Sequence, residues 1–108
     1  MTQVVYSERA LNDLDRLEDF LLEVNVAAAQ KTIPLIITAV KMLRQHPEIG
    51  RRCSGSMREL VISRGKTGYI ALYRYDEIHD VARVLAIRHQ REVGENLGHA
   101  DSSSKCNG

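Results

Sequence analysis

The sequence predicts an α+β fold in which an N-terminal strand and an antiparallel helical hairpin precede a three-stranded antiparallel meander, in the order β-α-α-β-β-β. Two observations support this prediction. Between residues 8 and 45, apolar side chains recur every three or four positions, which is typical of amphipathic helices. Residues 58–91 instead contain three short runs of β-branched and aromatic residues, separated by two clusters of turn residues. We expect the upstream part of the chain to pack on this sheet.

The chain opens with a short apolar run, Gln3–Tyr6, which we expect to be a strand. Ser7 then suits a helix N-cap, and Glu8 places a negative charge in the first turn, where it interacts favourably with the helix dipole. The helix should run to about Val24. Asn25 should end it in the left-handed conformation. The apolar stripe of this helix consists of Ala10, Leu14, Leu17, Leu21 and Val24.

A second helix is expected over roughly residues 27–45, and the very short connection makes the two helices an antiparallel hairpin. Pro34 does not fit a regular helix, because it removes a backbone hydrogen bond and clashes with the preceding turn. We expect either a kink near residues 30–34 or a helix that begins afresh at Pro34. His46 precedes Pro47 and should end the helix. The second apolar stripe consists of Val26, Ala29, Ile33, Ile36, Val40 and Leu43.

The meander follows a linker at residues 48–57. Its strands are expected at residues 58–63, 69–75 and 81–89, with a glycine-containing hairpin loop at 64–68 and a turn at 76–80. The middle strand is apolar on both faces, as expected for a central strand covered by helices. From residue 94 the sequence is polar. We therefore expect a single domain over residues 1–93 and a disordered tail over residues 94–108.

Composition and charge narrow the class of protein. The chain has 108 residues, of which 44% are hydrophobic and 27% charged, as in ordinary globular domains. No signal peptide is evident and no apolar run was expected to span a bilayer, so we expect a cytoplasmic protein with no membrane partner. Cys53 and Cys106 do not have metal-ligand spacing, and neither a metal nor a cofactor is expected.

The net charge is +1, but residues 50–91 contain nine basic and four acidic side chains. A basic sheet suggests an acidic partner, either protein or nucleic acid. The alternative is that these arginines only keep exposed strand faces in contact with water.

Several local sequences together resemble one family. They are V-V-Y-S-E-R-A-L-N-D-L, H-P-E-I-G-R-R, M-R-E-L-V-I, G-Y-I-A-L-Y-R-Y and V-L-A-I-R-H-Q-R, in this order. Over residues 3 to about 93 the chain resembles the ParE/RelE superfamily of bacterial type II toxin–antitoxin toxins, and it is closer to the ParE-like, plasmid-stabilisation branch. The resemblance implies one of two activities. RelE-like members cleave mRNA in the ribosome, and ParE-like members bind DNA gyrase and stall it with its DNA cut. In both branches an antitoxin wraps the toxin and inactivates it.

The residues favour a non-enzymatic gyrase inhibitor over a nuclease. Ribonuclease chemistry requires a base, an acid and cations at the scissile phosphate. Where RelE-like members carry an arginine just after the start of the second meander strand, this chain has Ile70, and no tyrosine follows Tyr75. The alternative is a metal-independent, ribosome-dependent mRNA endoribonuclease that uses His89, Arg88 and Arg91. A second alternative is an inactive toxin remnant that only binds the antitoxin.

Two sets of side chains are candidates for binding. Basic groups on the sheet could contact the target, whether gyrase or the ribosome with its mRNA, although solvated or structural roles would produce the same pattern. These candidates are Arg58, Arg74, Arg88, His89 and Arg91. By alternation, Arg88 and His89 should point to opposite faces of the sheet, and Arg74 could meet Arg58 or Arg88 across strands. Exposed apolar helix positions and two linker arginines could bind the antitoxin. These are Leu11, Leu22, Ile37, Arg51 and Arg52.

Overall fold

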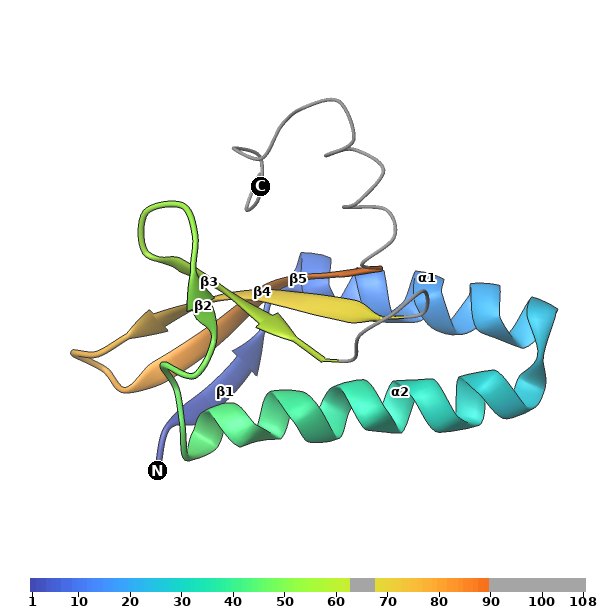
Figure 1. Cartoon of the computed structure of the whole chain (residues 1–108), viewed down its shortest axis with the longest axis horizontal. Helices are drawn as coiled ribbons and strands as arrows, with labels where there is room; N and C mark the ends of the chain where they lie inside the picture. Colours follow the sequence, from blue (N-terminus) through green and yellow to red (C-terminus); the bar gives the residue numbers. More distant parts are fainter. Residues whose placement is uncertain (63–67, 90–108) are drawn as a thin grey trace.

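The five strands form one sheet with both helices against one of its faces (Figure 1). The computed structural model describes residues 1–62 and 68–89. In chain order, the elements are β1 (Gln3–Tyr6), α1 (Glu8–Val24), α2 (Val26–Lys41), a 3₁₀ turn (Met42–Arg44), β2 (Arg51–Arg52), β3 (Met57–Val61), β4 (Tyr69–Asp76) and β5 (Val81–His89). The strand order is β1-β5-β4-β3-β2. β1 is parallel to β5, and the other neighbours are antiparallel. The predicted α+β fold is confirmed.

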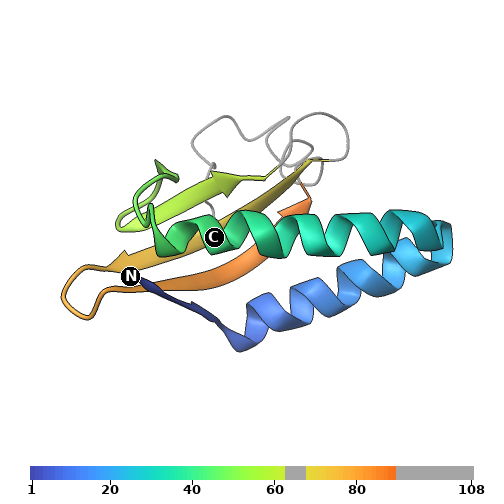
Figure 2. The same cartoon turned by 90° about the horizontal axis from the view of Figure 1, so that it is seen from below.

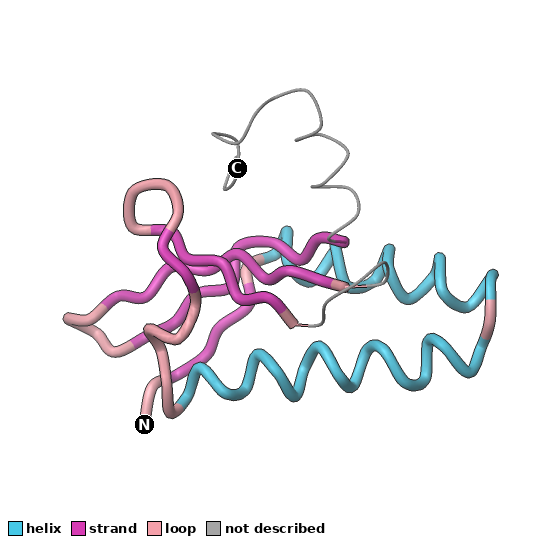
Figure 3. Tube along the Cα trace, in the orientation of Figure 1, coloured by secondary structure: helices cyan, strands magenta, loops and turns pink. Residues whose placement is uncertain are grey.

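The main core lies between the sheet and the helical hairpin (Figures 2 and 3). Tyr73 of β4 and Ile36, Val40 and Leu43 of the α2 region are its largest fully buried side chains, together with Val84 of β5. The helices cover only this face, so the expectation that they enclose the central strand on both sides is wrong. Neighbouring β4 residues point to the other face, and a second small cluster there consists of Ile70, Leu72 and Ala86. We call this second face the open face.

The N-terminus of α1 continues the pairing of β5 where β1 ends. The Ser7 amide donates to the carbonyl of Val84 at 2.9 Å. The Ser7 hydroxyl accepts from the Ala10 amide at 3.0 Å, as predicted for an N-cap, and donates to the carbonyl of Leu85 at 3.1 Å. One turn later, the buried Asp13 carboxylate accepts from the Ile87 amide at 3.0 Å. Helix side chains therefore satisfy the β5 backbone that lacks a neighbouring strand on this edge.

The predictions for the ends of the two helices need correction. Asn25 is extended, with φ −168° and ψ 112°, and is not left-handed. It ends α1 and also caps α2, because its side chain accepts from the amides of Ala27 and Ala28.

α2 continues through Pro34, so a helix that begins afresh at this residue is excluded. Gln30, whose carbonyl loses the Pro34 donor, is exposed to water, which reduces the cost of the missing bond.

The stretch Val26–Arg44, with a mean hydropathy of 1.4, is long and apolar enough by composition alone to cross a membrane. This corrects the expectation that no apolar run has that length. Within the described residues, the stretch contributes Ala29, Ile36, Val40 and Leu43 to the buried core, whereas its apolar residues Val26, Leu35, Ile37 and Met42 are exposed.

An irregularity in β5 decides which side chains reach each face. Leu72 pairs with Ala86, but the next residue, Tyr73, pairs with Val84, so Leu85 is the extra residue of a β-bulge. The bulge reverses the alternation of side chains along β5. Ala82 and Val84 before it and Ile87 after it consequently all lie in the core.

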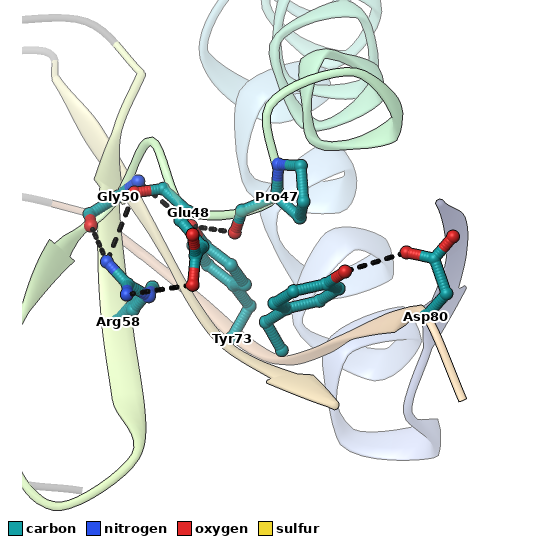
Figure 4. Close-up of polar contacts among 7 residues, drawn as sticks. Pro47, Glu48, Gly50, Arg58, Tyr73 and Asp80 are labelled. Atoms are coloured by element: carbon teal, nitrogen blue, oxygen red, sulfur yellow. Dashed lines mark hydrogen bonds and ion pairs between the residues drawn. The ribbon is translucent and has the colours of Figure 1, made fainter. Parts of the chain in front are cut away.

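The Tyr73 hydroxyl holds the segment between the 3₁₀ turn and β2 against the sheet (Figure 4). It donates to the carbonyl of Pro47 at 2.8 Å and accepts from the amide of Gly50 at 2.9 Å. The Arg58 guanidinium donates to the carbonyls of Glu48 at 3.1 Å and Gly50 at 2.9 Å. Burial raises the pKa of Tyr73, so the phenol remains a neutral donor.

Gly50 should not tolerate a larger side chain. A Cβ at this position would lie 2.6 Å from Cε1 and 2.7 Å from the hydroxyl oxygen of Tyr73. We expect Gly50→Ala to lower the free energy of unfolding, measured by urea denaturation, by about 1–3 kcal/mol through overpacking and loss of the Tyr73 hydrogen bonds. Ser56→Ala, a change at an exposed position of the same segment, is the control, whereas Gly55→Ala would add its own strain because Gly55 has φ +59°. A Gly50→Ala effect no larger than the Ser56→Ala effect would show that the contact with Tyr73 does not limit this position.

Candidate functional site

The open face carries a row of four residues from four adjacent strands. The strand register places Val5 of β1 beside Arg83 of β5, Arg83 beside Arg74 of β4, and Arg74 beside Met57 of β3. Arg74 and Arg83 are both exposed, and Val5 and Met57 are half-buried. Two positive charges therefore lie side by side between two partly accessible apolar groups.

Arg83 was not among the residues selected from the sequence. Strict alternation from Arg88 would place it on the helix-covered face, and only the bulge at Leu85 brings it beside Arg74. The predicted cross-strand partners of Arg74, Arg58 or Arg88, are wrong, because its partners are Met57 and Arg83. A bulge of one residue has no clear sequence signal here, so the pairing register of β4 with β5 could not be predicted from the sequence.

Arg88 and His89 occupy opposite faces of the sheet, as alternation predicted. Arg88 is half-buried on the open face, directly opposite Ile70. His89 is paired with Tyr69 and contacts its ring edge-on, with ring centroids 5.0 Å apart and an interplanar angle of 87°. Burial raises the pKa of Tyr69. The structure thus separates Arg88 from His89, while Arg91 lies outside the described residues.

Arg58 points away from the open face and is largely engaged within the chain. Its side chain is 17% exposed, donates to two carbonyls of the 48–50 segment, and lies 3.7 Å from the Glu48 carboxylate. A role in target binding stays a prediction, but these contacts give Arg58 a structural role that its sequence position did not reveal.

The residues predicted to bind the antitoxin are mostly accessible. Leu11, Leu22 and Ile37 are 51%, 44% and 38% exposed, so they are not ordinary core. Arg51 forms an ion pair with the buried carboxylate of Glu59, and Arg52 is exposed. Whether these five residues bind the antitoxin stays a prediction.

The end of the hairpin is also exposed, because it extends past the sheet (Figures 1 and 2). Phe20, Val24 and Val26 are 60%, 66% and 54% exposed. Val24 and Val26 lie on the predicted apolar stripes, but the sheet does not cover them.

All the tyrosines belong to the helix-covered face. Tyr69, Tyr73 and Tyr75 alternate along β4 and contribute to the main core, and Tyr6 packs against the same cluster. Burial raises the pKa of Tyr6, Tyr69 and Tyr73. In the described part of the chain, no phenol is placed beside the arginines of the open face.

No group of three or more His, Cys, Asp or Glu residues in residues 1–62 and 68–89 could hold a metal ion.

The β4–β5 turn contains two carboxylates with lowered pKa values. Asp80 accepts from the Thr2 hydroxyl at 2.7 Å and the Tyr75 hydroxyl at 2.8 Å, and these bonds lower its pKa. Hydrogen bonds from His79 lower the pKa of Asp76. Asp80 has a φ of 57°, a conformation that Asp and Asn adopt more readily than most residues. The contacts of Asp80 connect the turn to the N-terminus.

Comparison with known proteins identifies the family. The family model described as the ParE toxin of the type II toxin–antitoxin system, parDE, matches residues 4–94. The chain belongs to the ParE toxin family. Among curated relatives, Toxin RelE3 of Caulobacter vibrioides is 41% identical over 92 residues, covering 85% of this chain and 98% of that protein. Toxin RelE2 of the same organism is 34% identical over 89 residues, covering 82% and 96% respectively.

Solved structures show the same fold. The chromosomal ParDE system from P. aeruginosa has a TM-score of 0.69 at 24% identity, covering 82% of this chain and 96% of that chain. The intact RelBE toxin–antitoxin complex of E. coli has a TM-score of 0.58 at 14% identity, with the same coverages. The toxin is therefore a ParE/RelE superfamily member of a type II toxin–antitoxin system, as its sequence indicated.

The Asp80 contacts should make stability depend on pH. A carboxylate with a lowered folded-state pKa stabilises the fold above its unfolded-state pKa of about 3.9, and this contribution is lost as the pH falls through the folded-state value. Asp80→Asn, which also tolerates a positive φ, should lower the melting temperature at neutral pH, and the difference from the wild type should shrink towards pH 3. Glu77→Gln, an exposed change in the same turn, is the control. If Asp80→Asn lowered the melting temperature equally at neutral pH and at pH 3, the negative charge of Asp80 would not be the stabilising feature.

Proposed function

We propose that this toxin acts by binding and inhibiting DNA gyrase and that a cognate antitoxin neutralises it. The observation that carries the proposal is the surroundings of Arg88. Its cross-strand neighbour is the apolar side chain of Ile70, at the position where RelE-like members carry an arginine. His89 lies on the other face of the sheet. A general base and a phosphate clamp act together only when both reach the same reacting atoms. The separation of these groups favours action by binding.

None of the described residues places a tyrosine hydroxyl on the open face, and this supports the same proposal. The tyrosines are committed to the core or to the β4–β5 turn, and their raised pKa values keep them protonated. Inhibition by binding requires no acid–base pair, cofactor or metal.

We place the activity in residues 1–93 and in the cytoplasm, where gyrase and its DNA are found. The ParDE and RelBE neighbours support the antitoxin as a partner, because both are toxin–antitoxin assemblies.

Purified toxin should inhibit gyrase supercoiling and cause linear DNA to accumulate, and antitoxin should reverse both effects. Arg88→Ala should weaken inhibition by about tenfold or more, as expected for the loss of a charged contact worth at least 1.4 kcal/mol. Arg9→Ala, an exposed arginine of α1, is the control. Growth arrest in cells together with unaffected gyrase, at an excess of folded toxin, would reject the proposal.

The second candidate function is ribosome-dependent mRNA cleavage, with Arg88, His89 and Arg91 as the catalytic groups. The names of the curated relatives, Toxin RelE3 and Toxin RelE2, favour this candidate. It predicts cleaved mRNA after induction in cells, with loss of cleavage in both Arg88→Ala and His89→Ala. Intact mRNA during growth arrest would exclude it. A third possibility, an inactive antitoxin-binding remnant, predicts normal growth when the chain is expressed without antitoxin.

A further inference from the structure

Arg74 and Arg83 form an unusual pair on the open face. They are direct cross-strand partners, both are exposed, and neither forms an ion pair with any described residue. Like charges directly opposite one another destabilise a sheet. Arg16 and Arg51 are paired with the carboxylates of Asp13 and Glu59, whereas Arg74 and Arg83 lie opposite one another. An anionic group between Arg74 and Arg83 would convert repulsion into attraction.

The neighbours of this pair restrict the shape of an anionic partner. Val5 and Met57 lie at the two ends of the row, each half-buried and apolar. Adjacent strands lie about 4.8 Å apart, so the row spans about 14 Å. An extended peptide places alternate side chains on one side at intervals of about 6.8 Å. Three such side chains match the row, with the outer two over Val5 and Met57 and the central one between the arginines.

We propose that Val5, Arg83, Arg74 and Met57 form the docking site for an extended acidic segment of the antitoxin, with the pattern apolar–x–acidic–x–apolar. The central carboxylate would accept hydrogen bonds from both guanidinium groups, and such charge-assisted bonds are stronger than neutral ones. This proposal rests on the chain being a type II toxin and does not depend on gyrase as the target. It adds a site on the open face to the helix and linker residues already predicted to bind the antitoxin.

A peptide suits this surface better than a nucleic acid. Non-specific binding of single strands combines cationic groups with aromatic side chains on which bases stack. The tyrosines face the helices, and the one phenylalanine, Phe20, lies near the hairpin end. No phenylalanine or tyrosine of the described residues is therefore available for stacking at the row, whereas Val5 and Met57 offer aliphatic contacts.

The test uses full-length, isotopically labelled toxin and overlapping synthetic peptides spanning the antitoxin encoded with it. We expect a binding peptide to contain the proposed pattern and to shift the backbone NMR signals of Val5, Met57, Arg74 and Arg83. Replacing its central acidic residue with glutamine should weaken binding by about tenfold, measured by fluorescence anisotropy, which corresponds to about 1.4 kcal/mol. Signals that shift only on the helical hairpin or at β2 would overturn the proposal.

Substitutions in the toxin provide the complementary test. Arg74→Ala and Arg83→Ala should each weaken binding of that peptide by about tenfold, while Arg9→Ala leaves it unchanged. Arg83→Gln should also raise the melting temperature of the free toxin by about 1–5 °C, because it removes the repulsion from Arg74. Unchanged affinity in folded Arg74→Ala and Arg83→Ala proteins would reject the site.

Two further outcomes would assign the row to another partner and so overturn the proposal. In one, a single-stranded DNA or RNA oligonucleotide binds the toxin and loses affinity in both variants, while the peptide does not. In the other, the variants keep peptide binding but lose gyrase inhibition. If the gyrase proposal alone is wrong, wild-type toxin leaves gyrase unaffected and the peptide results stand, so the two failures are distinguishable.

Discussion

The bulge at Leu85 is the constraint on which the arrangement of both sheet faces depends. Without it, Ala82 and Val84 would share a face with Arg88, and Arg83 would point into the space filled by α1 and α2. With it, the apolar residues on both sides of Leu85 enter one core, and Arg83 and Arg88 both reach the open face. The N-terminus of α1 supports this irregular segment, because Ser7 binds the Leu85 carbonyl and Asp13 binds the Ile87 amide. A departure from regular strand geometry thus organises core and surface together.

The main elements could be predicted from local patterns, and what could not be predicted depends on long-range contacts. The helix stripes, the Ser7 cap and the three meander strands are properties of neighbouring residues. The parallel pairing of β1 with β5, the short strand β2 and the extended Asn25 depend on segments distant in the chain or on how the hairpin turns. Val24 matched a buried stripe, but its helix extends past the sheet and leaves it exposed. Periodicity identifies an apolar stripe but does not show how far the covering surface extends.

The same limit applies to the candidate site. The sequence indicated a basic sheet and the opposite orientations of Arg88 and His89, both of which follow from composition and alternation. It did not indicate that Arg58 binds the carbonyls of the 48–50 segment or that Arg83 lies beside Arg74. Both depend on register, and a one-residue slip changes the face of every side chain beyond it. The structure therefore adds a surface shared by four strands to the cluster expected at the end of one strand.

The pairing of β1 with β5 also has a consequence for how the toxin is made. The first strand finds its neighbour nearly eighty residues later, and contacts such as that between Thr2 and Asp80 close this long loop. Folds dominated by such non-local contacts form more slowly than folds built from local ones. Translation proceeds at about 5–20 residues per second, so the nascent chain lacks a complete sheet until β5 has been made. The surface that brings Val5, Arg83, Arg74 and Met57 together exists only after β5 has emerged, so an antitoxin segment that docks there can bind only after that point.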